Sequence, residues 1–137
     1  MEIRAVNPKE WGPSAWKFIH YVALVYPNNP TEEHKTNYRN FFYSLQHVLP
    51  CSKCSENYKK HLKDYPIEKS LDNNDSLFRW TVDIHNEVNI ITNKESISYD
   101  KAYNLYLNKQ KDIQDNFILF GFILLILVLG FYIKKYV

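Results

Sequence analysis

The chain has 137 residues, enough for one small domain and a short appendage. Its net charge of +2 is small and its basic residues are scattered, which argues against a nucleic-acid partner. Of only three glycines, Gly121 and Gly130 lie near the C-terminus, so the glycine-rich loop of Rossmann and P-loop nucleotide sites is missing. Aromatic residues make up 16% of the chain, which suits a compact core or a site for a flat ligand.

The N-terminal part predicts two helices. Asn7 can cap the first helix, with Pro8 at its first position and Glu10 as the capping-box partner. Pro27 ends this helix, and Thr31 begins the second, with acidic residues in the first turn where they favour the helix dipole.

Three further helices follow. A third helix is predicted over about 51–65, a fourth from Asp75 or Ser76 to about Ile91, and a short fifth over 98–111. Because no stretch alternates like a strand, the sequence predicts an all-α domain over residues 1–111, built as a small helical bundle.

The last segment, residues 112–137, is predicted to anchor the chain in a membrane. Residues 117–133 carry no charge and would span about 26 Å as a helix, just under the hydrocarbon thickness of a bilayer. A buried core helix is the alternative. Lysines flank both ends of the span, so orientation stays open, although a four-residue tail favours a soluble domain in the cytosol.

The chemical focus is a C-x-x-C pair, Cys51 and Cys54, which directly follows Pro50. A loop this short constrains the unfolded chain little, so the pair is interpreted as chemical rather than structural. A helix beginning at Cys51 and the charge of Lys53 would both favour a thiolate. Zinc would need two more ligands, a thioredoxin-like motif would need a βαβ setting, and two idle reduced cysteines remain an alternative.

Two further clusters lie on predicted helices. Trp16 and His20 are four residues apart on one face of the first helix, and His85 and Asn89 share a face of the fourth. Taken singly, a tryptophan at this spacing is usually part of the core, and a helix histidine is usually a satisfied polar residue.

The order of the motifs G-x-x-x-W-x-x-x-H, Y-P-x-x-P-T, P-C-x-x-C and H-N-x-V-N over residues 12–89 resembles the Erv/ALR family of FAD-linked sulfhydryl oxidases. The resemblance implies a four-helix bundle with a short fifth helix that holds FAD and no metal site. It implies that Cys51 and Cys54 are catalytic, with Cys54 against the flavin and Cys51 exchanging with the incoming thiol. It assigns cofactor contacts to ten residues: Lys9, Gly12, Trp16, His20, His85, Asn86, Val88, Asn89, Lys94 and Tyr106.

The resemblance also implies partners. Electrons would come from a thiol-bearing protein or a thioredoxin-like carrier and end on O2 as H2O2. The structural disulfide of many relatives is absent here, since Val82 and Tyr99 stand at the corresponding positions, and no shuttle cysteine pair occurs. The chain is similar in this to the minimal, membrane-anchored oxidases of large DNA viruses, which implies a membrane facing the host cytoplasm or a virion membrane.

The family often forms homodimers through its first helices, and Tyr21, Phe41 and Phe42 are the expected contacts. Two other functions stay open. The chain could be a non-enzymatic, tail-anchored helical adaptor whose cysteines act as a redox switch, or a flavin-free disulfide carrier that exchanges thiols without consuming oxygen.

Overall fold

The computed structural model describes the backbone of residues 6–136 and the side chains of residues 6–107, 117–127 and 129. Residues 6–136 contain helices and no strand, which confirms the predicted all-α class. The elements are α1 (Pro8–Leu24), α2 (Glu32–Val48), α3 (Ser52–Asp64), the 3-10 helix η1 (Ile67–Ser70), α4 (Asn74–Ile91) and α5 (Tyr99–Tyr136).

The first two helices begin where capping residues predict. Asn7 caps α1, and its side-chain oxygen accepts a hydrogen bond from the backbone N–H of Lys9 at 3.0 Å. The Glu10 side chain does not accept a hydrogen bond from the backbone N–H of Asn7, so the predicted capping box is not formed at α1. The capping box forms instead at α2, where Thr31 and the His34 side chain each accept from the other residue's backbone N–H.

Helices α3 and α4 follow the predicted ranges closely. Cys51 is the N-cap of α3, as predicted, and the helix ends at Asp64, just before Pro66. The N-cap of α4 is Asn73, two residues before Asp75 and three before Ser76, because its side-chain oxygen accepts from the backbone N–H of Ser76 at 2.9 Å. The one-turn helix η1 between them was not predicted, since four residues give no usable periodicity.

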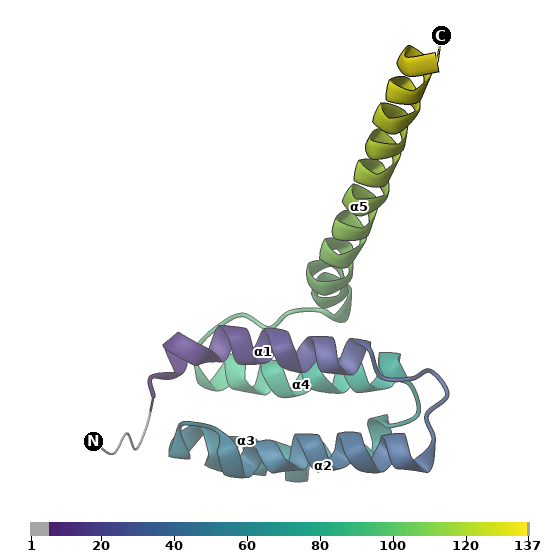
Figure 1. Ribbon diagram of the computed structural model, residues 1–137. Helices are drawn as coiled ribbons and strands as arrows, with labels where there is room; N and C mark the ends of the chain where they lie inside the picture. Colours follow the sequence, from purple (N-terminus) through teal and green to yellow (C-terminus); the bar gives the residue numbers. More distant parts are fainter. Residues whose placement is uncertain (1–5, 137) are drawn as a thin grey trace, which may run out of the picture. The chain divides into compact units, whose positions relative to one another are not determined.

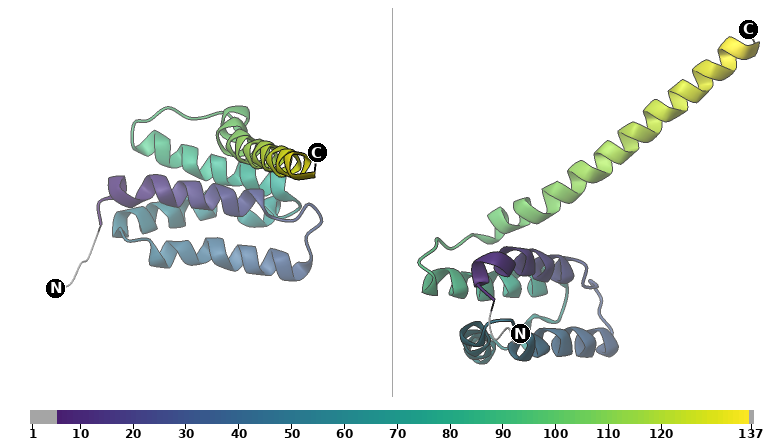
Figure 2. Two further views of the ribbon diagram at one scale, coloured as in Figure 1. Left: turned by 45° about the horizontal axis from the view of Figure 1, so that its top comes forward. Right: turned by 60° about the vertical axis from the view of Figure 1, so that its left-hand side comes forward.

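Within residues 6–99, α1 packs on α4 and α2 packs on α3, while η1 and α3 also contact α4 (Figures 1 and 2). Phe42 of α2 is fully buried and meets Trp80 of α4 edge to face, with ring centroids 5.0 Å apart. The expectation that Phe42 contacts a second copy is therefore wrong, because its ring is used in the core that joins α2 to α4.

The segment between α4 and α5 is held by side-chain hydrogen bonds to α4. Asn86 accepts from the backbone N–H of Ile97 at 2.9 Å and donates to its carbonyl at 3.0 Å. The Tyr99 hydroxyl donates to Asp83 at 2.6 Å, and this bond and burial raise the pKa of Tyr99 to about 12. Val82 is fully buried, so it packs the core here.

Helix α5 runs without a break over 38 residues, so the predicted short fifth helix and apolar span form one continuous helix. No proline lies between Tyr99 and Tyr136 that could end it. Among the described residues, no helix has both the length and the apolar character needed to cross a membrane. Part of the predicted span, residue 128 and residues 130–133, has side chains outside the described set.

Candidate functional site

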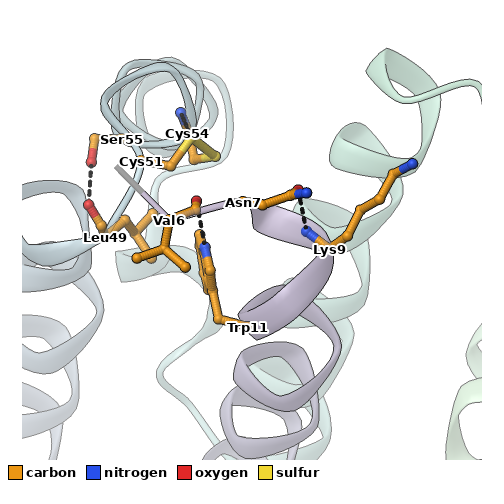
Figure 3. Close-up of a disulfide and its surroundings, with 8 residues drawn as sticks. All are labelled: Val6, Asn7, Lys9, Trp11, Leu49, Cys51, Cys54 and Ser55. Atoms are coloured by element: carbon orange, nitrogen blue, oxygen red, sulfur yellow. Dashed lines mark hydrogen bonds between the residues drawn. A yellow bond between two sulfur atoms is a disulfide. The ribbon is translucent and has the colours of Figure 1, made fainter. Parts of the chain in front are cut away.

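The two cysteines form a disulfide at the N-terminus of α3 (Figure 3). The backbone N–H of Cys54 donates to the sulfur of Cys51 at 3.2 Å. This hydrogen bond and the positive end of the helix dipole both stabilise a negative charge on Cys51 when the disulfide opens. Both residues are partly exposed, as a redox pair that exchanges with another protein requires.

The segment before α1 lies beside this disulfide. The backbone N–H of Val6 donates to the carbonyl of Pro50 at 2.8 Å, and the indole N–H of Trp11 donates to the carbonyl of Val6 at 3.3 Å (Figure 3). Trp11 therefore helps to fix the loop that precedes Cys51. The side chain of Lys9 points away from the disulfide in Figure 3.

A second centre joins α1 to α4 through aromatic rings. The rings of Trp16 and His85 lie parallel, with centroids 4.1 Å apart and an interplanar angle of 5°. His20 is almost completely buried, at 1% exposed, and its Nε2 lies 3.0 Å from Nδ1 of His85. Thus the structure brings together the two clusters that the sequence analysis identified separately, Trp16 with His20 and the cluster that contains His85.

Both histidines of this centre are neutral near pH 7. Burial, and then the neighbouring His85, lowers the pKa of His20 to about 3. Burial, and then the charge of Lys94, lowers the pKa of His85 to about 4. Neutral imidazoles can each donate one hydrogen bond and accept another, which suits a polar ligand contact.

Several features around this pair fit a flat, partly polar ligand such as a flavin nucleotide. A side-chain carbon built at Gly12 would meet nothing within 4 Å, so the space beside α1 is open there. Asn89 is 8% exposed, yet its side-chain amide makes no hydrogen bond to any described residue. This amide is not among the fully buried unpaired polar atoms, so its donors and acceptor stay accessible to a ligand.

Lys94 is brought back toward the end of α4 by a tight turn. Asn93 adopts a left-handed conformation with φ 54°, and the backbone N–H of Lys94 donates to the carbonyl of Asn89 at 2.8 Å. Lys94 itself is exposed, and its charge is close enough to lower the pKa of His85. A cation here could balance an anionic group of a ligand.

The remaining predicted contacts are placed less directly. The side-chain amide of Asn86 is hydrogen-bonded to the backbone of Ile97, so it fixes the segment after α4 rather than offering free donors to a ligand. Val88 is partly exposed on α4, and Tyr106 lies on α5, in the second compact unit of the chain. The cofactor roles of all ten residues stay predictions.

The sequence analysis missed two buried polar residues, of which Thr81 contacts this centre. Thr81 is fully buried and lies 2.9 Å from Nδ1 of His20 through its hydroxyl oxygen. His61 on α3 is also buried, and its Nε2 has no hydrogen-bond partner among the described residues. The only available signal was the four-residue spacing of Thr81 and His85 on one helix face. The described residues contain no group of three side chains suited to a metal ion.

The buried histidines predict a loss of stability in mild acid. The pKa values of His20 and His85 are lower in the folded chain than the ordinary 6.5, so the unfolded chain binds more protons below that pH. The free energy of unfolding should be highest above pH 6.5 and fall as the pH drops toward 4, by the order of 1–2 kcal/mol for each histidine between pH 7 and 5. Chemical denaturation at both pH values measures this change.

The matched control for this pH effect is the exposed His47. His47→Gln should keep the full loss between pH 7 and pH 5, whereas His85→Gln should reduce it. Equal stability of the unchanged protein at the two pH values would contradict the neutral, buried state of this pair.

The chain is similar to several known proteins. The family described as Erv1 / Alr family matches residues 13–111. A probable FAD-linked sulfhydryl oxidase, R368, of Acanthamoeba polyphaga mimivirus is 48% identical over 98 residues, which cover 71% of this chain and 68% of that protein. The FAD-linked sulfhydryl oxidase of African swine fever virus (isolate Warthog/Namibia/Wart80/1980) is 29% identical over 96 residues, covering 70% of this chain and 79% of that protein.

The fold also resembles solved structures. The crystal structure of the FAD binding domain of Erv1 from Saccharomyces cerevisiae superimposes with a TM-score of 0.69 at 25% identity, covering 74% of this chain and 94% of that one. The yeast mitochondrial FAD-linked sulfhydryl oxidase ERV1 itself is 30% identical over 89 residues, 63% of this chain. The match spans only 46% of that yeast protein, so less than half of its length is represented here.

Proposed function

This chain belongs to the Erv1 / Alr family, and from that premise we propose that it is an FAD-dependent thiol oxidase that forms disulfides in partner proteins. The proposal rests on the Cys51–Cys54 disulfide at a helix N-terminus, in one domain with the parallel Trp16–His85 pair. The net reaction is 2 R–SH + O2 → R–S–S–R + H2O2, which balances atoms and electrons.

Thiol exchange at the cysteine pair is the first step. A thiolate of the partner attacks the sulfur of Cys51, a mixed disulfide forms, and Cys54 leaves as a thiolate. A second thiolate of the partner then attacks the partner's sulfur in this mixed disulfide, and Cys51 leaves. The hydrogen bond from the backbone N–H of Cys54 stabilises the departing Cys51 thiolate, because a thiol of lower pKa leaves faster.

The pair has then gained two electrons and two protons and must return to the disulfide. When bound, FAD accepts both electrons and delivers them to O2, which becomes H2O2. The residues proposed to hold FAD fit its parts. Trp16 and His85 offer a stacking surface, the amide of Asn89 offers unpaired donors and an acceptor, and Lys94 offers a cation for the phosphates.

The visible spectrum of the purified full-length chain tests this function. A yellow protein that consumes oxygen when given a dithiol supports the oxidase. A colourless protein that exchanges thiols without oxygen uptake indicates the disulfide carrier. A colourless protein inert to thiols indicates the adaptor.

Trp16→Ala is expected to weaken FAD binding much more than it changes the helix content. Removing one aromatic surface of the site costs about 1–3 kcal/mol, which is about a 5- to 150-fold increase in the FAD dissociation constant. Flavin fluorescence titration measures the affinity, and far-ultraviolet circular dichroism measures the helicity. Loss of fold and flavin together would assign Trp16 to the core instead.

The control for Trp16→Ala is Phe18→Ala. Phe18 lies on the same helix, is aromatic and is 58% exposed, and it packs on Phe41 rather than on His85. FAD affinity should stay within about twofold of the unchanged protein, because no ligand contact is removed.

We also propose that residues 117–133 anchor the domain in a membrane. Phe117 to Leu125 are apolar apart from Gly121, and their side chains are exposed on α5, where water would solvate them poorly. The membrane proposed is that of a virion or of the host cell, with the oxidase domain in the cytoplasm. The full-length chain should sediment with membranes after expression, and a chain ending at residue 111 should stay in the supernatant. Equal distribution of the two chains between membrane pellet and supernatant would contradict the proposed membrane anchor.

A homodimer is part of the same proposal. Tyr21 and Phe41, on α1 and α2, remain the proposed contacts, and Phe42 is removed from them because it is buried. Sedimentation velocity of the purified chain distinguishes a dimer from a monomer.

A further inference from the structure

A continuous line of hydrogen bonds runs from the backbone carbonyl of Phe78 on α4 through Thr81 and His20 to the ring of His85. The hydroxyl of Thr81 donates to the carbonyl of Phe78 at 2.6 Å. The same hydroxyl oxygen lies 2.9 Å from Nδ1 of His20, and Nε2 of His20 lies 3.0 Å from Nδ1 of His85. Thr81, Phe78 and His20 are buried, so water does not interrupt this line.

The threonine sets the direction of these bonds. A hydroxyl has one hydrogen, and at Thr81 it points to the carbonyl of Phe78, which can only accept. The oxygen of Thr81 must therefore accept from His20, so His20 carries its hydrogen on Nδ1. Because the buried His20 ring is neutral, its Nε2 carries no hydrogen and can only accept.

The tautomer of His20 in turn sets the tautomer of His85. Nδ1 of His85 must carry a hydrogen in order to donate to Nε2 of His20. Since His85 is also neutral, its Nε2 is a bare acceptor. The ring is partly exposed, it is held flat against Trp16, and no described residue donates to this nitrogen. An acceptor of fixed position is thus presented at the edge of the stacked Trp16–His85 pair.

We propose that Thr81 and His20 are positioning residues that hold His85 in the Nδ1–H tautomer, so that its Nε2 accepts a hydrogen bond from a hydroxyl or amino hydrogen of the bound cofactor. This inference rests on the proposed function for the identity of the ligand. It also excludes a contact between this nitrogen and a phosphate oxygen, because two acceptors repel. Phosphates are left to Lys94, whose ammonium can only donate.

Nitrogen NMR of the full-length chain, labelled with ¹⁵N-histidine in detergent micelles, reads the tautomers directly. The two ring nitrogens of a neutral histidine have different shifts according to which carries hydrogen. A coupling across the bond between His85 Nδ1 and His20 Nε2 would identify this pair among the five histidines. Both rings should be in the Nδ1–H form, which is the less common form of a free histidine side chain.

Two matched variants test the role of the hydroxyl. Thr81→Val has nearly the same shape but cannot accept from His20. Both rings should then switch together to the Nε2–H form, and FAD should bind about tenfold more weakly because His85 now presents a donor. Thr81→Ser keeps the hydroxyl, so it should keep both tautomers and an affinity within about twofold.

Three outcomes would overturn the inference: an Nε2–H form of His85 in the unchanged chain, unchanged tautomers in Thr81→Val, or switched tautomers with unchanged FAD affinity. If Thr81→Val does not fold, the spectrum of the unchanged chain still decides the tautomer. A chain that binds no FAD but shows both Nδ1–H forms would reject the proposed function while leaving the hydrogen-bonded line intact.

Discussion

Cys51→Ser and Cys54→Ser should each abolish thiol-dependent oxygen uptake, yet they should accumulate different species. In Cys51→Ser, Cys54 can no longer be tied up in the disulfide and remains as a thiol. If its thiolate lies against the oxidised flavin, a broad long-wavelength absorption band should appear. In Cys54→Ser this band should be missing, because Cys51 is proposed to meet the partner and not the flavin.

The second variant should instead trap a partner. In Cys54→Ser, Cys51 remains as a thiol, and its thiolate can attack the disulfide of the oxidised partner protein. The mixed disulfide should accumulate, because no Cys54 thiolate remains to displace the partner and re-form the Cys51–Cys54 disulfide. A non-reducing gel followed by mass spectrometry would show this adduct and identify the donor. The oxygen electrode and the visible spectrum complete the measurement for both variants.

Ser52→Ala is the control for the cysteine pair. Ser52 is exposed in the first turn of α3, and its replacement leaves both sulfurs and the N–H of Cys54 in place. Oxygen uptake should stay close to that of the unchanged chain. If the absorption band appeared in Cys54→Ser and the trapped partner in Cys51→Ser, the roles of the two cysteines would be exchanged. If neither variant showed the band or a trapped partner, the case for an oxidase would be lost.

Phe42→Ala should lower the free energy of unfolding by about 3–5 kcal/mol, the usual cost of removing a buried phenylalanine ring. The ring is fully buried against Trp80, and the backbone carbonyl of Phe42 accepts from the buried hydroxyl of Tyr58 at 3.2 Å. Phe42 therefore ties α2 to both α3, which carries Cys54, and α4, which carries His85. Denaturant titration followed by circular dichroism measures the loss.

A loss of this size is a large part of the 5–15 kcal/mol typical of a small domain. Phe18→Ala provides the comparison, because its exposed ring should cost less than about 1 kcal/mol. A change below 1 kcal/mol for Phe42→Ala, together with a loss of dimer, would return Phe42 to the interface between copies.

Local signals in the sequence were sufficient for the helices of the domain. Side chains of Asn7 and Thr31 cap the helices that they were predicted to begin, and Cys51 caps the third. Each of these bonds joins residues two or three positions apart, so their energies are set by nearby residues alone. The start of α4 was misplaced by two residues because Asn73 and its neighbours Asp75 and Ser76 are all good caps, and only one can be used.

The long helix shows where the sequence analysis placed a helix end that the structure does not have. The sequence analysis ended a short helix at residue 111 because the apolar run begins soon after it. A change from polar to apolar residues alters what a helix contacts, but it does not break backbone hydrogen bonds. With no proline in the range, α5 continues from Tyr99 to Tyr136.

The ordered motifs by themselves determined the family and the redox pair, and they predicted the residue types that contact the cofactor, since these depend on spacing along one helix or on residue identity. Only the tertiary structure decided how they work together. Trp16 and His20 of α1 meet His85 and Thr81 of α4 because α1 packs on α4, which joins residues 61 to 69 positions apart. The direction of their hydrogen bonds depends on a single hydroxyl hydrogen and on burial that keeps both histidines neutral. Neither can be read from residue spacing, because burial and ring contacts exist only once the helices have packed.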